Sequence, residues 1–153
     1  MPRRHYHLAQ INIGRMLAPL DSEIMAGFVN NLDRINALAE GWPGFVWRLK
    51  GDGNDATSLR PYEDDMMIVN MSVWETVEDL QAYVYRSDHT DILRQRKQWF
   101  SKMDIYHCMW WIRAGHIPTV EEAKARLEIL GRQGESAESF TFRHIFPAPD
   151  ASG

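Results

Sequence analysis

The feature that most constrains the fold is a nearly continuous apolar run between Asp65 and Glu75. Only Asn70 and Ser72 interrupt its aliphatic, methionine and tryptophan side chains. A strand with one wet face alternates between apolar and polar residues, whereas a strand that is covered on both faces is apolar throughout. We therefore expect a strand over residues 65–75 in the interior of a sheet.

Alternation and aromatic content predict three further strands, over residues 6–14, 43–49 and 104–115. Strict alternation in the short middle strand places Phe45, Trp47 and Leu49 on one face and Val46 and Arg48 on the other. The stretch that follows it is rich in Gly, Pro and acidic residues, so we expect an exposed loop there.

Periodic apolar residues predict three helices, which begin near residues 21, 76 and 119. Thr76 and Thr119 are suited to cap the second and third helices, because a threonine oxygen accepts a first-turn N–H. Gly41 is expected to end the first helix in a left-handed conformation. The second helix is expected to continue to about Lys102, and the third to end near residues 131–134.

The order strand, helix, strand, strand, helix, strand predicts a ferredoxin-like α+β fold, with a split βαβ antiparallel sheet and helices on one face. An extra C-terminal helix, a short strand over residues 140–146 and a polar tail from about residue 147 complete a single domain over residues 1–153. The second face of such a sheet would lie bare, although its residues are apolar or aromatic. We therefore expect a homodimer whose two sheets close face to face.

Composition restricts the partners. The net charge of −4, with 17 Lys and Arg against 21 Asp and Glu, disfavours nucleic-acid binding, which needs a basic surface. One cysteine excludes an internal disulfide, and no apolar run reaches the roughly 18 residues of a membrane span. We expect a soluble, cytoplasmic bacterial protein with neither a nucleic-acid nor a membrane partner.

Several short motifs are spread over nearly the whole chain. They are His7-Leu8-Ala9-Gln10, Trp47, Ser72-Val73-Trp74-Glu75, His89 with Leu93, Arg94, Arg96, Trp99 and Phe100, Trp110-Trp111, Gly115-His116-Ile117-Pro118-Thr119, Glu122-Ala123, and Ala137 with Phe140-Thr141-Phe142. On these motifs the sequence resembles the domain-of-unknown-function 3291 family. The resemblance implies a dimeric α+β barrel, similar to the antibiotic-biosynthesis monooxygenases.

The stretch from Asp79 to Met109 gathers aromatic and basic side chains around a histidine. Helical spacing places Tyr85, His89 and Arg96 on one side of the second helix. The resemblance implies that histidines between helices and sheet bind substrate or, in haem-containing branches, iron. His89 is therefore the candidate catalytic residue, and a structural hydrogen bond from its ring to neighbouring backbone is the alternative.

A wall of aromatic side chains with a few polar groups is typical of pockets for flat organic molecules. The candidate substrate-binding residues are Asn12, Trp47, Trp74, Tyr85, Arg96, Trp99, His107 and Trp110. Packing in the core or in a dimer interface is the alternative for the tryptophans. The spacing of His107 and His116 matches no ligand motif, so we expect no metal site.

The sequence contains no phosphate-binding glycine loop, dinucleotide fingerprint, paired-cysteine motif or serine nucleophile elbow. Two functions remain open. The first is a cofactor-independent, monooxygenase-like enzyme that acts on an aromatic or polyketide-like substrate in a pocket between helices and sheet. The second is a non-catalytic dimer that binds a hydrophobic small molecule, or haem, in the same pocket. A purely structural dimer is a third possibility.

Overall fold

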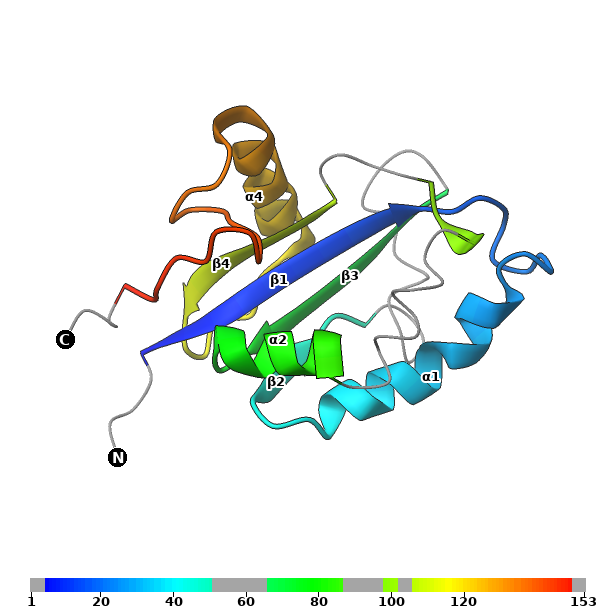
Figure 1. Cartoon of the computed structure of the whole chain (residues 1–153), viewed down its shortest axis with the longest axis horizontal. Helices are drawn as coiled ribbons and strands as arrows, with labels where there is room; N and C mark the ends of the chain where they lie inside the picture. Colours follow the sequence, from blue (N-terminus) through cyan, green and yellow to red (C-terminus); the bar gives the residue numbers. More distant parts are fainter. Residues whose placement is uncertain (1–4, 51–65, 87–97, 102–105, 150–153) are drawn as a thin grey trace.

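A four-stranded antiparallel sheet forms the centre of the molecule (Figure 1). The computed structural model describes residues 5–50, 66–86, 98–101 and 106–149. The strands are β1 (Tyr6–Arg15), β2 (Phe45–Arg48), β3 (Met67–Trp74) and β4 (His107–Arg113), and their order in the sheet is β2-β3-β1-β4. The prediction of an interior β3 is confirmed, as is the ferredoxin-like α+β fold.

Two helices, α1 (Ala26–Glu40) and α2 (Val77–Arg86), lie over one face of the sheet (Figure 1). Ala39 of α1 and Leu80 of α2 belong to one buried cluster with Leu8, Trp74 and Met109 of the sheet. The Thr76 hydroxyl accepts the N–H of Asp79 over 3.0 Å, which confirms the predicted cap of α2. This face of the sheet carries the polar residues on which the site is built.

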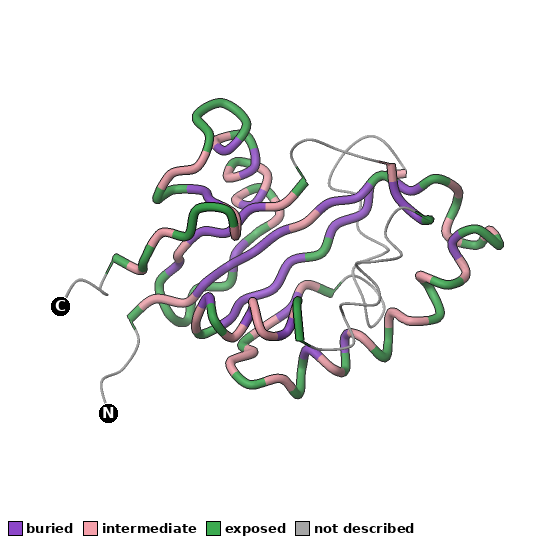
Figure 2. Tube along the Cα trace, in the orientation of Figure 1, coloured by how far each residue is buried: buried purple, intermediate pink, exposed green. Residues whose placement is uncertain are grey.

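Helix α4 (Val120–Gln133) packs against the opposite face, through an apolar stripe that includes Ala123, Leu127 and Leu130. Thr119 caps it, as predicted, by accepting the N–H of Glu122. The sheet residues of this cluster, among them Ile11, are at most 7% exposed within one chain, and Figure 2 shows β1 buried along most of its length.

The second face of the sheet was expected to lie bare until a second copy covered it. This premise is wrong, because the stripe of α4 packs against that face within the same chain. The homodimer itself stays a prediction, which native mass spectrometry at micromolar concentration tests.

Strand β2 departs from the alternation expected of it. A register shift between Phe45 and Trp47 places one extra residue opposite β3, so Phe45 pairs with Trp74 while Trp47 pairs with the adjacent Val73. Phe45 therefore packs in the helix-side cluster and Trp47 against the cluster of α4. The prediction that both rings share a face is wrong, because a β-bulge reverses the parity of the residues that follow it.

The left-handed glycine after α1 is Gly44 and not Gly41. Gly41 has a φ of −91°, whereas Gly44 has a φ of 87°. A β-carbon at Gly44 would also clash with the carboxylate of Asp79, and the carbonyl of Gly44 accepts the N–H of Glu75. Glycine is thus required where the chain turns beneath α2, three residues later than the prediction placed it.

Two further boundaries differ from prediction. Phe100 forms an isolated β-bridge with Met16, so helix does not continue to Lys102. The expected strand over residues 140–146 is reduced to one bridge between Phe140 and Met109. The predicted loop over residues 50–64 lies outside the described residues, apart from Lys50.

In the described parts of the chain, no helix combines the length and the apolar character of a membrane span.

Candidate functional site

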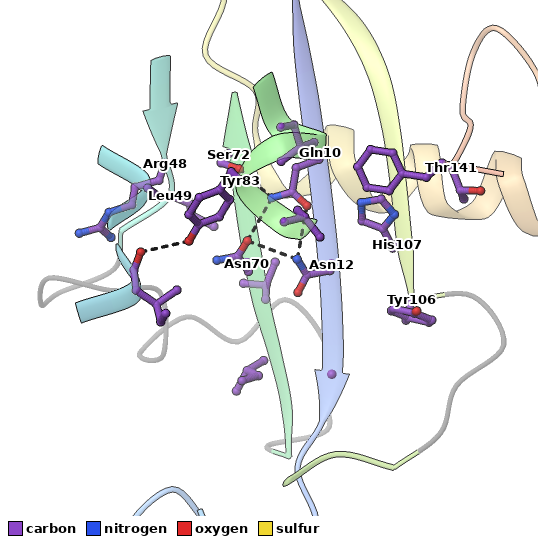
Figure 3. A pocket seen from close by; sticks show the side chains of 18 of the residues that line it. Gln10, Asn12, Arg48, Leu49, Asn70, Ser72, Tyr83, Tyr106, His107 and Thr141 are labelled. Carbon is purple, nitrogen blue, oxygen red and sulfur yellow. Dashed lines mark hydrogen bonds between the residues drawn. The ribbon is translucent and has the colours of Figure 1, made fainter. Parts of the chain in front are cut away.

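A cavity of about 660 Å³ lies between the sheet and helices α1 and α2 (Figure 3). Its described lining comes from all four strands or their ends, from α1 and α2, and from the segment after α4. The lining residues used below are Gln10, Asn12, Gly14, Phe28, Asn36, Arg48, Asn70, Ser72, Trp74, Tyr83, Tyr85, Trp99, Phe100, His107, Glu135, Thr141 and Phe142. A volume of this size lies within the roughly 300–1,000 Å³ that small-molecule sites usually have.

The floor of the cavity is a polar cluster of Gln10, Asn12, Asn70 and Ser72, the amide–hydroxyl cluster. Antiparallel pairing sets Gln10 opposite Ser72 and Asn12 opposite Asn70, so all four side chains share one face of β1 and β3. Gln10 Nε2 donates to Ser72 Oγ over 2.7 Å and to Asn70 Oδ1 over 3.0 Å. Asn12 Nδ2 donates to Gln10 Oε1 and to Asn70 Oδ1, each over 3.3 Å (Figure 3).

Trp74 and Tyr83 form an aromatic wall beside this cluster. Their rings stack with centroids 5.1 Å apart, and Trp74 Nε1 donates to Ser72 Oγ over 2.8 Å. The Tyr83 hydroxyl donates to the carbonyl of Ile35 over 3.0 Å and so ties α2 to α1. Burial raises the pKa of Tyr83, and the nearby Arg48 lowers it only in part. The phenol therefore stays neutral and serves as a wall rather than as a base.

Arg48 brings a positive charge to the same side of the cavity. Its residue is 6% exposed, and Nη2 lies 3.5 Å from Oε1 of Glu40, whose side chain is 41% exposed. Arg48 pairs with Ser72 across β2 and β3, which sets the guanidinium side chain on the face of the amide–hydroxyl cluster. Ligand oxygens with negative charge are favoured near such a buried cation.

His107 and Phe142 line the cavity beyond β4, where their rings stack 5.7 Å apart at 20°. Tyr85 meets Phe142 edge to face, with centroids 5.6 Å apart. Glu135 holds this segment, because its carboxylate accepts bonds from both the backbone N–H and the hydroxyl of Thr141. The start of β4 and the segment after α4 thus form one wall together, in which β4 supplies an imidazole and the segment supplies the ring that stacks on it.

The remaining end of the cavity is apolar. Phe28 of α1 meets Phe100 edge to face at 5.1 Å and meets Trp99 at 5.7 Å. Trp99 and Phe100 are 2% and 8% exposed, so their rings form part of the core as well as of the lining. The cavity therefore combines a polar floor with aromatic walls.

Five of the predicted substrate-binding residues line this cavity, namely Asn12, Trp74, Tyr85, Trp99 and His107. Trp47 and Trp110 do not, because both pack in the cluster on the other face of the sheet. Trp110 donates instead to Oε2 of Glu122, at the start of α4. His89 and Arg96 lie outside the described residues, so their roles stay predictions.

The predicted substrate-binding residues omit four that the structure brings to the floor and wall, namely Gln10, Asn70, Ser72 and Tyr83. The signal for three of them was present, because Gln10 and Asn12 share a face of one strand and Asn70 and Ser72 are the only polar residues in another. What the sequence lacked was the register that pairs them. Tyr83 lies on the helix where aromatic and basic side chains gather, but an aromatic residue on a helix usually packs in the core, so it was left out of the predicted site.

A haem would need an imidazole or another axial ligand facing the cavity. His107 is the lining imidazole in the described part of the chain. Those same residues hold no group of three or more His, Cys, Asp or Glu side chains arranged around a common point for a metal ion. The described residues therefore offer a haem iron one axial histidine ligand at most.

Comparison with known proteins places the chain in a family. The family model described as a domain of unknown function, DUF3291, matches residues 7–153. The chain belongs to this family. A search of the curated proteins found no match to this DUF3291 protein.

Two solved structures are similar to the DUF3291 protein at low identity. One, from Chloroflexus aurantiacus J-10-fl and provisionally named an antibiotic biosynthesis monooxygenase, is 15% identical, with a TM-score of 0.47 over 72% of this chain and 97% of its own. The other, a protein of unknown function from Nitrosomonas europaea, is 12% identical, with a TM-score of 0.47 over 76% of this chain and 99% of its own.

Proposed function

We propose that this DUF3291 protein binds a flat, aromatic small molecule with oxygen substituents in the cavity between the sheet and helices α1 and α2. The observation that carries the proposal is the amide–hydroxyl cluster at the centre of an apolar sheet. Four polar side chains here replace apolar ones at paired positions of two interior strands. Polar groups at such positions are costly unless their hydrogen bonds are satisfied, so a polar ligand is a physical reason to keep them.

The shape of the cavity supports a flat ligand. Trp74 and Tyr83 stack at one side, and Phe28, Trp99 and Phe100 close the apolar end. Aromatic rings bind planar molecules by stacking and by apolar burial. A ligand of this class would lie with its ring against these walls and its oxygens towards the floor.

The activity that fits such a ligand is cofactor-independent oxygenation, similar to that of antibiotic-biosynthesis monooxygenases. An aromatic or polyketide-like substrate that ionises to an electron-rich anion can react with dioxygen directly. In this proposal His89 acts as the acid–base residue, and His107 orients the substrate from the end of β4. The alternative is a binder without turnover, for a hydrophobic molecule or for haem.

The experiment is a binding screen of planar naphthalene- and anthracene-based ketones and phenols, with tryptophan fluorescence and calorimetry as readouts. Gln10→Leu removes the amide that holds Ser72 Oγ and Asn70 Oδ1 in place, and should weaken binding about tenfold, which corresponds to the roughly 1 kcal/mol of one hydrogen bond between these residues and the ligand. Glu138→Gln is the control, because Glu138 is exposed and is not one of the described lining residues. Equal binding by both variants would contradict a site in this cavity.

Oxygen consumption with the ligands that bind separates enzyme from binder. The enzyme proposal expects uptake that His89→Ala abolishes while ligand affinity is kept. Binding without uptake supports the non-catalytic alternative. An absorption band of haem in the freshly purified protein, lost in the variant of the histidine that ligates iron, would identify the haem binder.

A further inference from the structure

The hydrogen bonds of the amide–hydroxyl cluster have a direction. Ser72 Oγ accepts from Trp74 Nε1 over 2.8 Å and from Gln10 Nε2 over 2.7 Å. An indole N–H can only donate, and a hydroxyl oxygen has two lone pairs, so both acceptor positions of Ser72 are used. The Ser72 hydroxyl is left as a donor, and no described residue accepts from it.

Asn70 likewise has its acceptor oxygen used and its donor groups unused. Its Oδ1 accepts from Gln10 Nε2 over 3.0 Å and from Asn12 Nδ2 over 3.3 Å. Its Nδ2 carries two N–H groups for which the described residues offer no acceptor, and Asn70 is the exposed residue of β3. In Figure 3 the nitrogen of Asn70 points away from its bonded neighbours. Asn70 and Ser72 therefore present donors on one face of β3.

A buried amide on α1 faces the same cavity. Asn36 is 8% exposed and belongs to the lining, and its side chain makes no hydrogen bond within the described part of the chain. The amide atoms of Asn36 are not fully buried, so solvent or a ligand in the cavity can reach them. Side-chain hydrogen-bonding groups that no described residue satisfies thus line the cavity on both β3 and α1.

We propose that Ser72 and Asn70 form a subsite for an acceptor oxygen, which takes the carbonyl or anionic oxygen of the ligand and rejects an amine or ammonium group. This deepens the proposed function and rests on it, since it names which end of the ligand meets the floor. The positive charge of Arg48, whose strand position pairs with that of Ser72, adds preference for negative oxygen. Asn12 Oδ1, at the other end of the cluster, accepts from a hydroxyl beside the carbonyl.

The test is a matched series on one ring system: ethylnaphthalene, naphthyl methyl ketone, naphthoate and naphthylethylammonium. Binding to the full chain is measured by calorimetry and by competition. The ketone and the carboxylate should bind at least about tenfold tighter than ethylnaphthalene, and the ammonium compound weaker than ethylnaphthalene. If the ammonium compound binds tightest, both amides are turned the other way and the inference is overturned.

Two variants assign the preference to these residues. Ser72→Ala should cut the affinity for the ketone roughly five- to tenfold and leave ethylnaphthalene unchanged. Asn70→Asp exchanges two donors for a charged acceptor and should abolish the preference for naphthoate over the ammonium compound. Asn70 is exposed, so this variant stays folded even where Ser72→Ala does not.

The outcomes separate the two proposals. If ethylnaphthalene binds as tightly as the ketone, the proposal of an aromatic ligand in this cavity stands and only the acceptor-oxygen subsite is overturned. A preference that survives both variants also overturns the subsite. Failure of the whole series to bind overturns the proposed function, and the inference falls with it.

Discussion

Phe100 lies directly over Gly14, so closely that a β-carbon at residue 14 would lie 2.7 Å from Cδ1 of the ring. Gly14 follows Asn12 on the face of β1 that lines the cavity. The absence of a side chain at this position lets the phenyl ring cover the end of the strand. The transition from polar floor to apolar wall thus depends on a glycine.

Gly14→Ala should therefore push Phe100 out of its position and destabilise the fold by about 1–3 kcal/mol, the usual cost of overpacking. Urea unfolding measures this free energy. Phe100→Leu in the same chain should restore part of the loss, because it shortens the side chain that clashes. Gly41→Ala is the control, since its β-carbon would approach only Ala37 O, at 3.7 Å. Equal losses in the two alanine variants would contradict the packing argument.

The sequence predicted the interior strand and the helix caps because their causes are local. Apolar residues at both odd and even positions mark β3 as a strand covered on two faces. The hydroxyl of Thr119 bonds to a backbone N–H only three residues further along the chain. The bulge in β2 has no such cause. The position of its extra residue depends on how Phe45 and Trp47 pair with β3, which is distant in the sequence. Alternation alone therefore predicted, wrongly, that the two rings lie on the same face of the sheet.

The candidate site was predictable in part for the same reason. Asn12 and His107 were both selected as candidate substrate-binding residues, and the structure pairs them across β1 and β4. The alternation of residues along β4 left open which face of the sheet α4 would cover, and so Trp110 was assigned to the pocket although it lies under that helix. Register and helix placement are long-range properties, which a pattern along one segment does not contain.

Tyr83→Phe should lower the free energy of unfolding by about 1 kcal/mol, because it removes the hydrogen bond to Ile35 that joins α2 to α1. The stacked ring on Trp74 is kept. Tyr85→Phe is the matched control two residues along the helix, because Tyr85 is 54% exposed. Chemical denaturation of both variants at neutral pH makes the comparison, and equal losses would show that the Ile35 bond contributes nothing.

The same tyrosine should make the protein sensitive to alkali. Burial raises the pKa of Tyr83 above its ordinary value of 10.0, against a smaller opposing effect of Arg48. A raised folded-state pKa gives stability that is present below pH 10 and is lost as the pH rises through the folded value. Between pH 9 and 12 the free energy of unfolding should therefore fall more steeply in the natural protein than in Tyr83→Phe.

Glu122 should contribute a small stability that disappears in acid. Burial acts to raise its pKa, but hydrogen bonds from His116 Nε2 and Trp110 Nε1, at 2.8 and 2.9 Å, outweigh this and lower it from 4.5. A lowered folded-state pKa gives stability that is present above pH 4.5 and is lost as the pH falls through the folded value. Since the pair is partly solvated, we expect only about 0.5 kcal/mol.

Glu122→Gln tests this, with Glu121→Gln as the control at the neighbouring, exposed position of the same helix turn. Unfolding free energies from pH 6 to pH 3 should fall less in Glu122→Gln than in the natural protein. Glu121→Gln should follow the natural protein, because it removes one carboxylate near the same helix end without removing a bond. Parallel curves for all three proteins would contradict the assignment.

Cys108 should report the opening of the α4 face. It is fully buried in the cluster with Ile11 and Trp110, and burial raises the pKa of its thiol to about 12, against smaller lowering effects of Ser139 and Arg126. The thiolate is the reactive form, so at pH 8 the native thiol should react with a disulfide reagent at least about 100-fold more slowly than the unfolded chain. Leu127→Ala loosens the packing of α4 and should raise the native rate towards the unfolded one, whereas Glu128→Gln on the exposed side of the same helix should not.

A fast reaction of Cys108 in the unaltered native protein would mean that α4 does not keep this face of the sheet closed. A second copy of the chain would then again be the expected cover of this face.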